Sequence, residues 1–231
     1  MFVQAARSCF RTLARRKMSE RMHPEQLGFF ERRMFADHLA RYRFASRLVR
    51  GKRVLDIACV DGYGARILSR TAREVVAVDI ERPRLGGRRP NLRFVCSDAI
   101  QFLQRTKQRY DVIVSFETVE HLRAYQRFLA LLKHRLKAGG LLVLSTPNKR
   151  FSDLFFGGTF NPYHVKEFYT RELSQAIAQV FGATPELYRV RPIRKQRIVW
   201  SAIRSFLHRE PSIQKSRHDM TGIGNMFVVR K

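Results

Sequence analysis

Short apolar runs alternate along the chain with longer stretches in which apolar residues recur every three or four positions. The short runs contain several Val and Ile residues and predict buried strands, whereas the longer stretches predict amphipathic helices. The predicted strands are RVLDIA at 53–58, Val75–Asp79, Leu92–Cys96, Val112–Phe116, Leu141–Ser145, Leu187–Val190 and Met226–Val229. The predicted helices are Glu25–Val49, a helix from near Ala65, Ala99–Thr106, Tyr125–Leu136 and Thr170–Phe181. Strands that alternate with helices form parallel sheets, so the pattern predicts an α/β fold with a mostly parallel sheet.

The chain has 231 residues, a length that suits one domain with one large core. We expect a single domain at 20–231, preceded by a basic tail at 1–19 that contains no acidic residue. The apolar residues between Phe2 and Leu13 recur at helical spacing, which is typical of a targeting or membrane-surface helix. A dispensable tail, or a true start at Met18, explains the same residues. The tail lacks the apolar stretch and the small-residue cleavage site of a secretory signal.

The first predicted strand leads into a glycine loop, and acidic residues lie near the ends of three successive strands. Asp56 precedes Gly62 and Gly64, and Asp79 and Asp98 follow on the next two strands. Glycines let backbone approach a ligand at the carboxyl edge of an open sheet, and an acid there accepts ribose hydroxyls. Together these residues suggest a ligand with an amine, a diol and an adenine, a description that fits S-adenosylmethionine. Each acid alone is equally explained as a loop residue or a helix cap.

Five segments resemble the successive motifs of class I S-adenosylmethionine-dependent methyltransferases: LDIACVDGYG, VVAVDIE, LRFVCSDA, YDVIVSFETVEHL and LKAGGLLVLSTPN. The resemblance covers roughly Tyr42 to Phe181. It implies a Rossmann-like fold with a mostly parallel seven-stranded sheet and helices on both faces. It also implies an enzyme that uses S-adenosylmethionine as methyl donor.

The resemblance further implies which residues contact the cofactor. Asp56, Ala58, Gly62 and Gly64 would hold its methionine end. The other implied contacts are Asp79 at the ribose, Asp98 with Ala99 at the adenine, Phe116 at the reactive side and Tyr42 closing over it. Ile80, next to Asp79, is a further implied cofactor contact.

Within that superfamily, three segments most resemble bacterial enzymes associated with O-antigen and other surface-polysaccharide synthesis: ARYRFASRLVRGKRVLDIAC, SFETVEHL and NPYHVKEFYTREL. Those enzymes are thought to methylate sugar hydroxyls or terminal phosphate. The resemblance implies O-methylation of a hydroxyl on a surface glycan or glycolipid precursor.

Two departures from the family pattern stand out. Val60 occupies a position where family members usually have glycine, and a β-branched residue is strained there if the position needs a positive φ. Only Glu81–Asn91 joins the second and third strands, which is near the minimum for a parallel crossover. We therefore expect the usual helix there to be a turn or to be missing, and the adenine side to be more open.

A second constellation contains Glu117, Glu120 and His121, with His164 in a later loop. Residues at i, i+3 and i+4 share one helical face, so the first three can converge beyond the fourth strand. Two carboxylates and two imidazoles suit a divalent metal that orients the acceptor oxygen and lowers its pKa. The pattern also resembles the metal-binding motifs of small-RNA 2′-O-methyltransferases and ubiquinone-pathway O-methyltransferases. The alternatives are His121 as a general base without metal, with Glu117 assisting, or acids that merely favour a helix N-terminus.

The net charge of +26 favours contact with nucleic acid or an anionic membrane, although an Arg-biased coding composition explains it equally well. Three scattered cysteines form no disulfide framework or zinc spacing, which suits a cytoplasmic protein, peripheral at the inner membrane face at most. No apolar stretch is long enough to span a membrane. Two alternatives remain: methylation of RNA at a ribose 2′-hydroxyl, and a non-catalytic basic scaffold in which Val60 has abolished cofactor use.

Overall fold

The computed structural model describes residues 29–83, 89–159, 161–194, 211–216 and 220–231, so the basic tail predicted at 1–19 lies outside it. The described strands form one eight-stranded sheet in the order β3-β2-β1-β4-β5-β8-β6-β7. Strands β1 to β5 pair in parallel, and β8, β6 and β7 pair antiparallel. The strands are β1 (Arg53–Ile57), β2 (Glu74–Asp79), β3 (Leu92–Cys96), β4 (Tyr110–Phe116), β5 (Leu136–Pro147), β6 (Glu186–Arg194), β7 (Ile213–Lys215) and β8 (Met220–Arg230).

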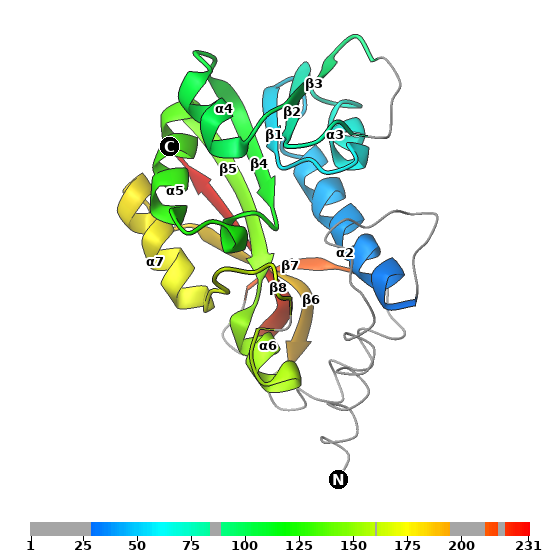
Figure 1. Cartoon of the computed structure of the whole chain (residues 1–231), viewed down its shortest axis with the longest axis vertical. Helices are drawn as coiled ribbons and strands as arrows, with labels where there is room; N and C mark the ends of the chain where they lie inside the picture. The colour runs from blue at the N-terminus through cyan, green and yellow to red at the C-terminus, as the bar shows by residue number, and fades with distance from the viewer. Residues whose placement is uncertain (1–28, 84–88, 160, 195–210, 217–219) are drawn as a thin grey trace.

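Helices cover both faces of the sheet (Figure 1). The helices are α2 (Phe29–Ser46), α3 (Tyr63–Leu68), α4 (Ala99–Arg105), the 3-10 turn η2 (Val119–His121), α5 (Tyr125–Arg135), α6 (Lys149–Phe156) and α7 (Thr170–Phe181). Helices α4, α5 and α7 pack on one face, and α2 and α3 pack on the other. In the part of the chain that the structure describes, no helix is both long and apolar enough to cross a bilayer.

Alternation along β1 divides the core into two layers. Leu55 and Ile57 pack with α4, α5 and α7, whereas Val54 packs with α2 and α3. Because successive side chains of a strand point to opposite faces, Asp56 lies on the same face as Val54. The same alternation places Phe116, at the end of β4, in the core layer of α2 and α3. The period of the strands therefore brings Asp56 and Phe116 to one face at the carboxyl edge of the sheet.

The Rossmann-like α/β fold with helices on both faces is confirmed, and most predicted elements are present within a few residues. Two elements were missed: helix α6 and the short edge strand β7, which makes eight strands instead of seven. Helix α6 has only eight residues. Asn148 caps its start by accepting a hydrogen bond from the Arg150 amide, and Gly157 ends it at a φ of 75°. The crossover after β2 has no helix in its described residues, 81–83 and 89–91, as expected.

Candidate functional site

Tyr42 of α2 lies over the glycine loop that follows β1. Its hydroxyl donates to Asp56 Oδ1 at 3.1 Å, and its ring meets the ring of Phe116 edge-on at 5.0 Å between centroids. The same ring contacts Gly64, where an added Cβ would lie 2.0 Å from Tyr42 Cζ. Four of the predicted cofactor residues are therefore in direct contact, from helix α2, strands β1 and β4, and helix α3.

Asp56 is fully buried, and its second carboxylate oxygen has no hydrogen-bond partner among the described residues. Burial raises its pKa to about 8, the hydrogen bond from Tyr42 opposes that rise, and the charge of Asp79 adds to it. A buried carboxylate oxygen without a partner is costly unless a cation or donor pairs with it. The amine of a bound cofactor would supply such a partner.

Asp79 organises the loops at the end of β2. Its Oδ2 accepts from the Val60 amide at 2.8 Å, and its Oδ1 accepts from the Glu81 amide at 3.3 Å. A carboxylate has about four acceptor positions, so Asp79 can also accept ribose hydroxyls. The loop that it binds has positive φ angles at Ala58 (62°), Val60 (49°) and Gly62 (80°). The predicted condition for strain at Val60, a positive φ, is therefore met.

The residues predicted to contact the adenine, Asp98 and Ala99, follow β3, and the predicted cofactor residue Ile80 follows β2. Ile80 is 66% exposed, which leaves apolar surface for a flat base beside Asp79. Asp98 caps α4 by accepting from the Gln101 amide at 2.9 Å, and Ala99 is the first residue of that helix. Asp98 therefore acts as a helix cap, which was the alternative explanation for an acid at this position. The cap uses Oδ1 and leaves the other carboxylate oxygen for a ligand.

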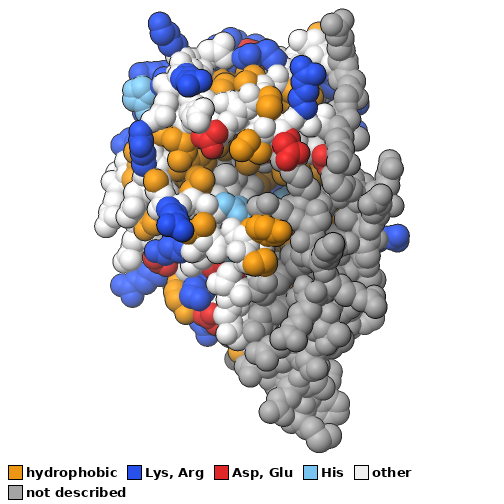
Figure 2. All heavy atoms as spheres, viewed as in Figure 1, with side chains coloured by type: hydrophobic (Ala, Val, Ile, Leu, Met, Phe, Trp, Pro, Cys, Tyr) orange, Lys and Arg blue, Asp and Glu red, His pale blue; other side chains and the backbone are white. Residues whose placement is uncertain are grey.

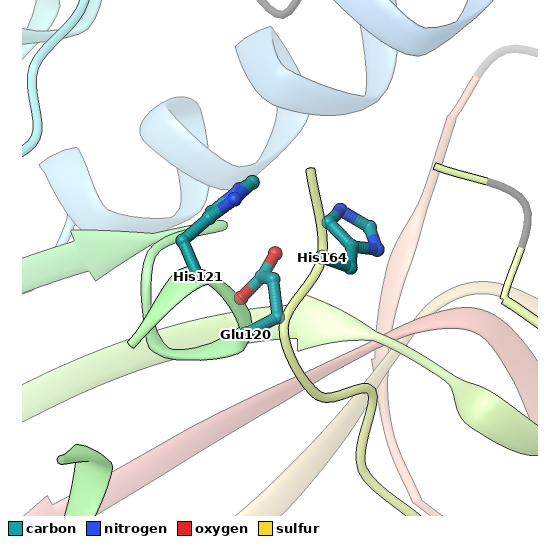
Figure 3. Close-up of side chains that lie close together, drawn as sticks. All are labelled: Glu120, His121 and His164. Carbon is teal, nitrogen blue, oxygen red and sulfur yellow. The ribbon is translucent and has the colours of Figure 1, made fainter. Parts of the chain in front are cut away.

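Glu120, His121 and His164 converge at the end of β4, as Figure 3 shows. One potential ligand atom from each lies within 4.8 Å of the others. The rings of His121 and His164 meet edge-on at 5.0 Å between centroids. Glu120 and His121 come from η2, and the loop that carries His164 is fixed to it, because the amides of Val165 and Lys166 donate to the Glu120 carbonyl.

Glu117 is not part of this group, so three of the four predicted metal ligands converge instead of four. It lies outside η2 with a φ of 50°, and its Oε1 accepts from Ser145 Oγ at 2.7 Å. The guanidinium of Arg41 is 3.4 Å from the same oxygen. The expected helical face fails because η2 begins at Val119, two residues after the positive φ at Glu117, so Glu117 does not belong to that turn.

The pKa values of the two glutamates shift in opposite directions because their surroundings differ. Burial alone would raise the pKa of Glu117, but the charge of Arg41, with His38 and Ser145, lowers it overall. Burial and then the charge of Glu117 raise the pKa of Glu120. Glu120 Oε2 accepts from Thr146 Oγ1 at 3.1 Å, and its Oε1 is buried without a hydrogen-bond partner in the described structure. A cation beside Glu120 would satisfy that oxygen.

Sequence reasoning missed Arg41 and His38 as site residues, although both stand at core-facing positions of the predicted first helix. Arg41 is 5% exposed. Burial, with Arg41 nearby, lowers the pKa of His38 to about 4, which keeps its imidazole neutral. A charged residue on the apolar stripe of a helix was the available signal, because buried charges require partners.

The residues present fit S-adenosylmethionine. The unpartnered oxygen of Asp56 suits its amine, Asp79 its ribose, and Ile80 with Asp98 its base. When bound, the cofactor supplies an electrophilic methyl group. The rings of Tyr42 and Phe116 contact each other beside Asp56. The cluster of Glu120, His121 and His164 lies beyond the end of β4. The edge of the sheet therefore carries residues that fit the cofactor and, beyond β4, a separate group of candidate ligand and base residues.

The comparisons with known proteins identify the family of this chain. A family model described as a methyltransferase domain matches residues 30–191. A probable S-adenosylmethionine-dependent methyltransferase of Mycobacterium tuberculosis is 29% identical over 146 residues, which cover 62% of this chain and 53% of that protein. A ubiquinone biosynthesis O-methyltransferase of Coxiella burnetii is 30% identical over 110 residues, 45% of this chain and 47% of that protein. The chain thus spans about half the length of these curated relatives.

Solved structures share the fold at low sequence identity. A possible histamine N-methyltransferase of Thermotoga maritima has a TM-score of 0.62 and 15% identity, covering 87% of this chain and 94% of that one. The N-methyltransferase NodS of Bradyrhizobium japonicum, solved with S-adenosyl-L-homocysteine, has a TM-score of 0.53 and 17% identity over 87% of each chain. Since the family model covers well over half of the sequence, this chain belongs to the class I S-adenosylmethionine-dependent methyltransferases.

Proposed function

We propose that this methyltransferase methylates a hydroxyl oxygen of a surface glycan or glycolipid precursor. The observation that carries the proposal is the convergence of Glu120, His121 and His164 beyond β4. A hydroxyl is a weak nucleophile, and its attack on a methyl carbon is helped by a base or a metal that withdraws its proton. The cluster supplies groups of both kinds at the edge of the sheet where Asp56 and Phe116 lie.

His121 is the proposed base or metal ligand. Its Nδ1 donates to the Tyr163 carbonyl at 3.0 Å, so the electron pair of the neutral ring is on Nε2. Glu117, kept ionised by Arg41, adds negative charge near the cluster and favours a cation there. Proximity of the acceptor oxygen to the methyl carbon then provides much of the rate.

A divalent metal fits the cluster because the donors are one carboxylate and two imidazoles and because Glu120 Oε1 lacks a partner in the described part of the chain. Mixed oxygen and nitrogen donors suit manganese, iron or cobalt better than magnesium, which prefers oxygen. Glu120, His121 and His164 would hold the ion, which would supply Lewis acidity to the acceptor oxygen. Glu117 would act from outside this group.

Three further observations support an oxygen acceptor on a glycan. One curated relative is a ubiquinone biosynthesis O-methyltransferase. The segments around Tyr42, His121 and His164 resemble enzymes of surface-polysaccharide synthesis. Tyr163 and Val165, which flank His164, are 53% and 50% exposed and offer apolar surface on which a sugar or lipid can rest.

The acceptor is tested by incubating cell fractions with methyl-labelled cofactor and the purified protein. We expect label in glycan or glycolipid, lost in His121→Ala and kept in the control His134→Ala, a histidine exposed at the end of α5. Chelation should abolish transfer, and Mn²⁺ should restore it. If transfer ignores the chelator while His121→Ala abolishes it, His121 acts as base without a metal. Label in protein, or in no fraction, contradicts the proposal.

Methylation of RNA at a ribose 2′-hydroxyl is the second candidate, and the net charge of +26 favours it. Figure 2 shows Lys and Arg side chains spread over the described surface, many of them beside apolar side chains. The same surface suits contact with an anionic membrane at the cytoplasmic face, where a glycolipid precursor would be presented. Label in RNA, together with nucleic acid that co-purifies and is removed by salt, would favour the RNA acceptor.

A further inference from the structure

Glu167 is a buried carboxylate that touches the candidate acceptor site through His164. It is 4% exposed, and its Oε1 is 2.8 Å from His164 Nδ1. The side chains of the two residues are 0% and 6% exposed. Glu167 follows the NPYH segment and precedes α7, so the contact closes the loop on itself.

Two hydrogen bonds determine which nitrogen of His164 carries the proton. A neutral imidazole carries one proton, and here Nδ1 lies 2.8 Å from a carboxylate oxygen of Glu167, to which it donates. On the other side of the ring, Nε2 accepts from Asn161 Nδ2 at 3.0 Å. The orientation of that amide is itself determined, because Asn161 Oδ1 accepts from the Tyr163 amide. The neutral ring therefore has its proton on Nδ1 and its electron pair on Nε2.

In Figure 3 one ring nitrogen of His164 lies on the side of Glu120 and His121, and the other points away from them. Because Nδ1 is occupied by its hydrogen bond to Glu167, Nε2 is the nitrogen that can bind a partner at the cluster once the hydrogen bond from Asn161 is replaced. A neighbouring carboxylate fixes the tautomer and orientation of an imidazole and makes its other nitrogen a stronger donor of electrons. Asn161 Nδ2 donates to this nitrogen, so a metal or an acceptor that binds it must replace that hydrogen bond.

We infer that Glu167 is the positioning residue of His164, which it holds with Nε2 presented to Glu120 and His121. The inference rests on the proposed function only for what Nε2 binds, a metal or the acceptor, and not for the orientation itself. A role as a mere loop anchor explains less, because the Val165 and Lys166 amides already fix the loop to Glu120. An anchor also needs no charge, whereas Glu167 is a buried acid whose Oε2 has no hydrogen-bond partner within the described residues.

The test compares Glu167→Gln and Glu167→Ala in the full chain, with Glu172→Gln as matched control. Glu172 is an acid of the neighbouring helix α7 that pairs with Lys166 at the surface. The first measurement is the ¹⁵N shift pattern of His164, which reports the tautomer and requires neither metal nor activity. We expect the proton on Nδ1 in wild type, Glu167→Gln and Glu172→Gln, because a glutamine oxygen still accepts. In Glu167→Ala we expect a mixture of tautomers.

The second measurement is the affinity for Co²⁺ alone, by calorimetry and by the visible absorption of the ion. Loss of a carboxylate behind a ligating histidine weakens metal binding about 10- to 100-fold. We expect a loss of that size in Glu167→Ala, a smaller loss in Glu167→Gln and no change in Glu172→Gln. Binding of S-adenosyl-L-homocysteine should be the same in all four proteins, because the hydrogen bond of Glu167 goes to His164, which is not one of the predicted cofactor residues.

The inference is overturned if wild type carries the His164 proton on Nε2, or if Glu167→Ala leaves the tautomer unchanged. Should Glu167→Ala fail to fold, an unchanged Co²⁺ affinity in Glu167→Gln overturns it equally. A wild-type protein that binds no Co²⁺ but shows the expected tautomers contradicts the metal in the proposed function and leaves the inference standing. Co²⁺ binding that needs His164 but not Glu167 contradicts the inference and leaves the metal site standing.

Discussion

The ring of Tyr42 occupies the space in which Gly64 would carry a side chain, since a Cβ there would lie 2.0 Å from Tyr42 Cζ. The ring is fixed in that place by its hydrogen bond to Asp56 and its edge contact with Phe116. Sequence reasoning assigned Gly64 to close approach by a ligand. In the structure its near neighbour is a residue of helix α2, so Gly64 is needed to seat Tyr42.

Gly64→Ala should displace Tyr42 and break its hydrogen bond to Asp56. Overpacking of this kind costs about 1–3 kcal/mol of folding free energy. We expect a fall of that size in urea denaturation and at least a tenfold weaker binding of S-adenosyl-L-homocysteine in calorimetry.

The control is a double-mutant cycle with Tyr42→Ala, which removes the ring. In that background Gly64→Ala should be nearly neutral, because the clash is gone. If Gly64→Ala lowers stability and ligand affinity as much in the Tyr42→Ala background as in wild type, the glycine is required by the backbone or the ligand and not by Tyr42.

Asp56 should make the stability of the protein fall as the pH rises. Its pKa is raised to about 8 in the folded state, against 3.8 as its ordinary value. Between those values the folded state holds a proton that the unfolded state has released, so the free energy of unfolding decreases with pH, by at most about 1.4 kcal/mol per unit. Urea denaturation between about pH 5 and about pH 8 should show this slope, and Asp56→Asn should remove it.

Other groups titrate in the same range, so the informative quantity is the difference between wild type and Asp56→Asn at each pH. Burial lowers the pKa of His38 to about 4, which acts in the opposite sense and is present in both proteins. A difference that does not change with pH would mean that Asp56 is ionised in the folded protein.

Much of the fold was predictable because it depends on local periodicity. β3 and α7 have the predicted bounds, Leu92–Cys96 and Thr170–Phe181, since each has a clear pattern and clear stops. Helix α6 was missed because it is two turns long and rich in Phe beside Gly, which reads as a loop. Its existence depends on the caps at Asn148 and Gly157.

The cofactor residues were predictable because parallel strands end at one edge, where residues distant in sequence meet. The acceptor side was predicted less well. Glu117 was assigned to a helical face that does not exist, since the backbone turns at a positive φ and gives its carboxylate to Arg41 and Ser145. Glu167 has no sequence signal, because its role comes from a contact with His164 in a loop without regular structure.

Asp79→Ala should weaken S-adenosyl-L-homocysteine binding at least tenfold. It removes the acceptor for ribose hydroxyls, and hydrogen bonds to charged groups contribute about 1.5–3 kcal/mol. It also releases the Val60 and Glu81 amides, so some loss of stability should accompany it. Asp98→Ala is the matched comparison, with loss of a helix cap costing about 1 kcal/mol. Equal affinity in wild type and Asp79→Ala, measured by calorimetry, would remove Asp79 from the site.

Val60→Gly should stabilise the protein slightly and bind S-adenosyl-L-homocysteine as well as wild type or up to about threefold better. Val60 has a φ of 49°, where an L-residue is strained by about 1–2 kcal/mol. Glycine relieves this strain but adds about 0.5–1 kcal/mol of unfolded-state entropy, so the net gain should be below about 1 kcal/mol. The amide that donates to Asp79 is kept, so the loop should retain its shape.

Ala58→Gly is the control, because Ala58 also has a positive φ, 62°, and glycine should relieve backbone strain there in the same way. If Val60→Gly binds the ligand tenfold more weakly while Ala58→Gly does not, the valine side chain packs productively and this loop has evolved its own geometry.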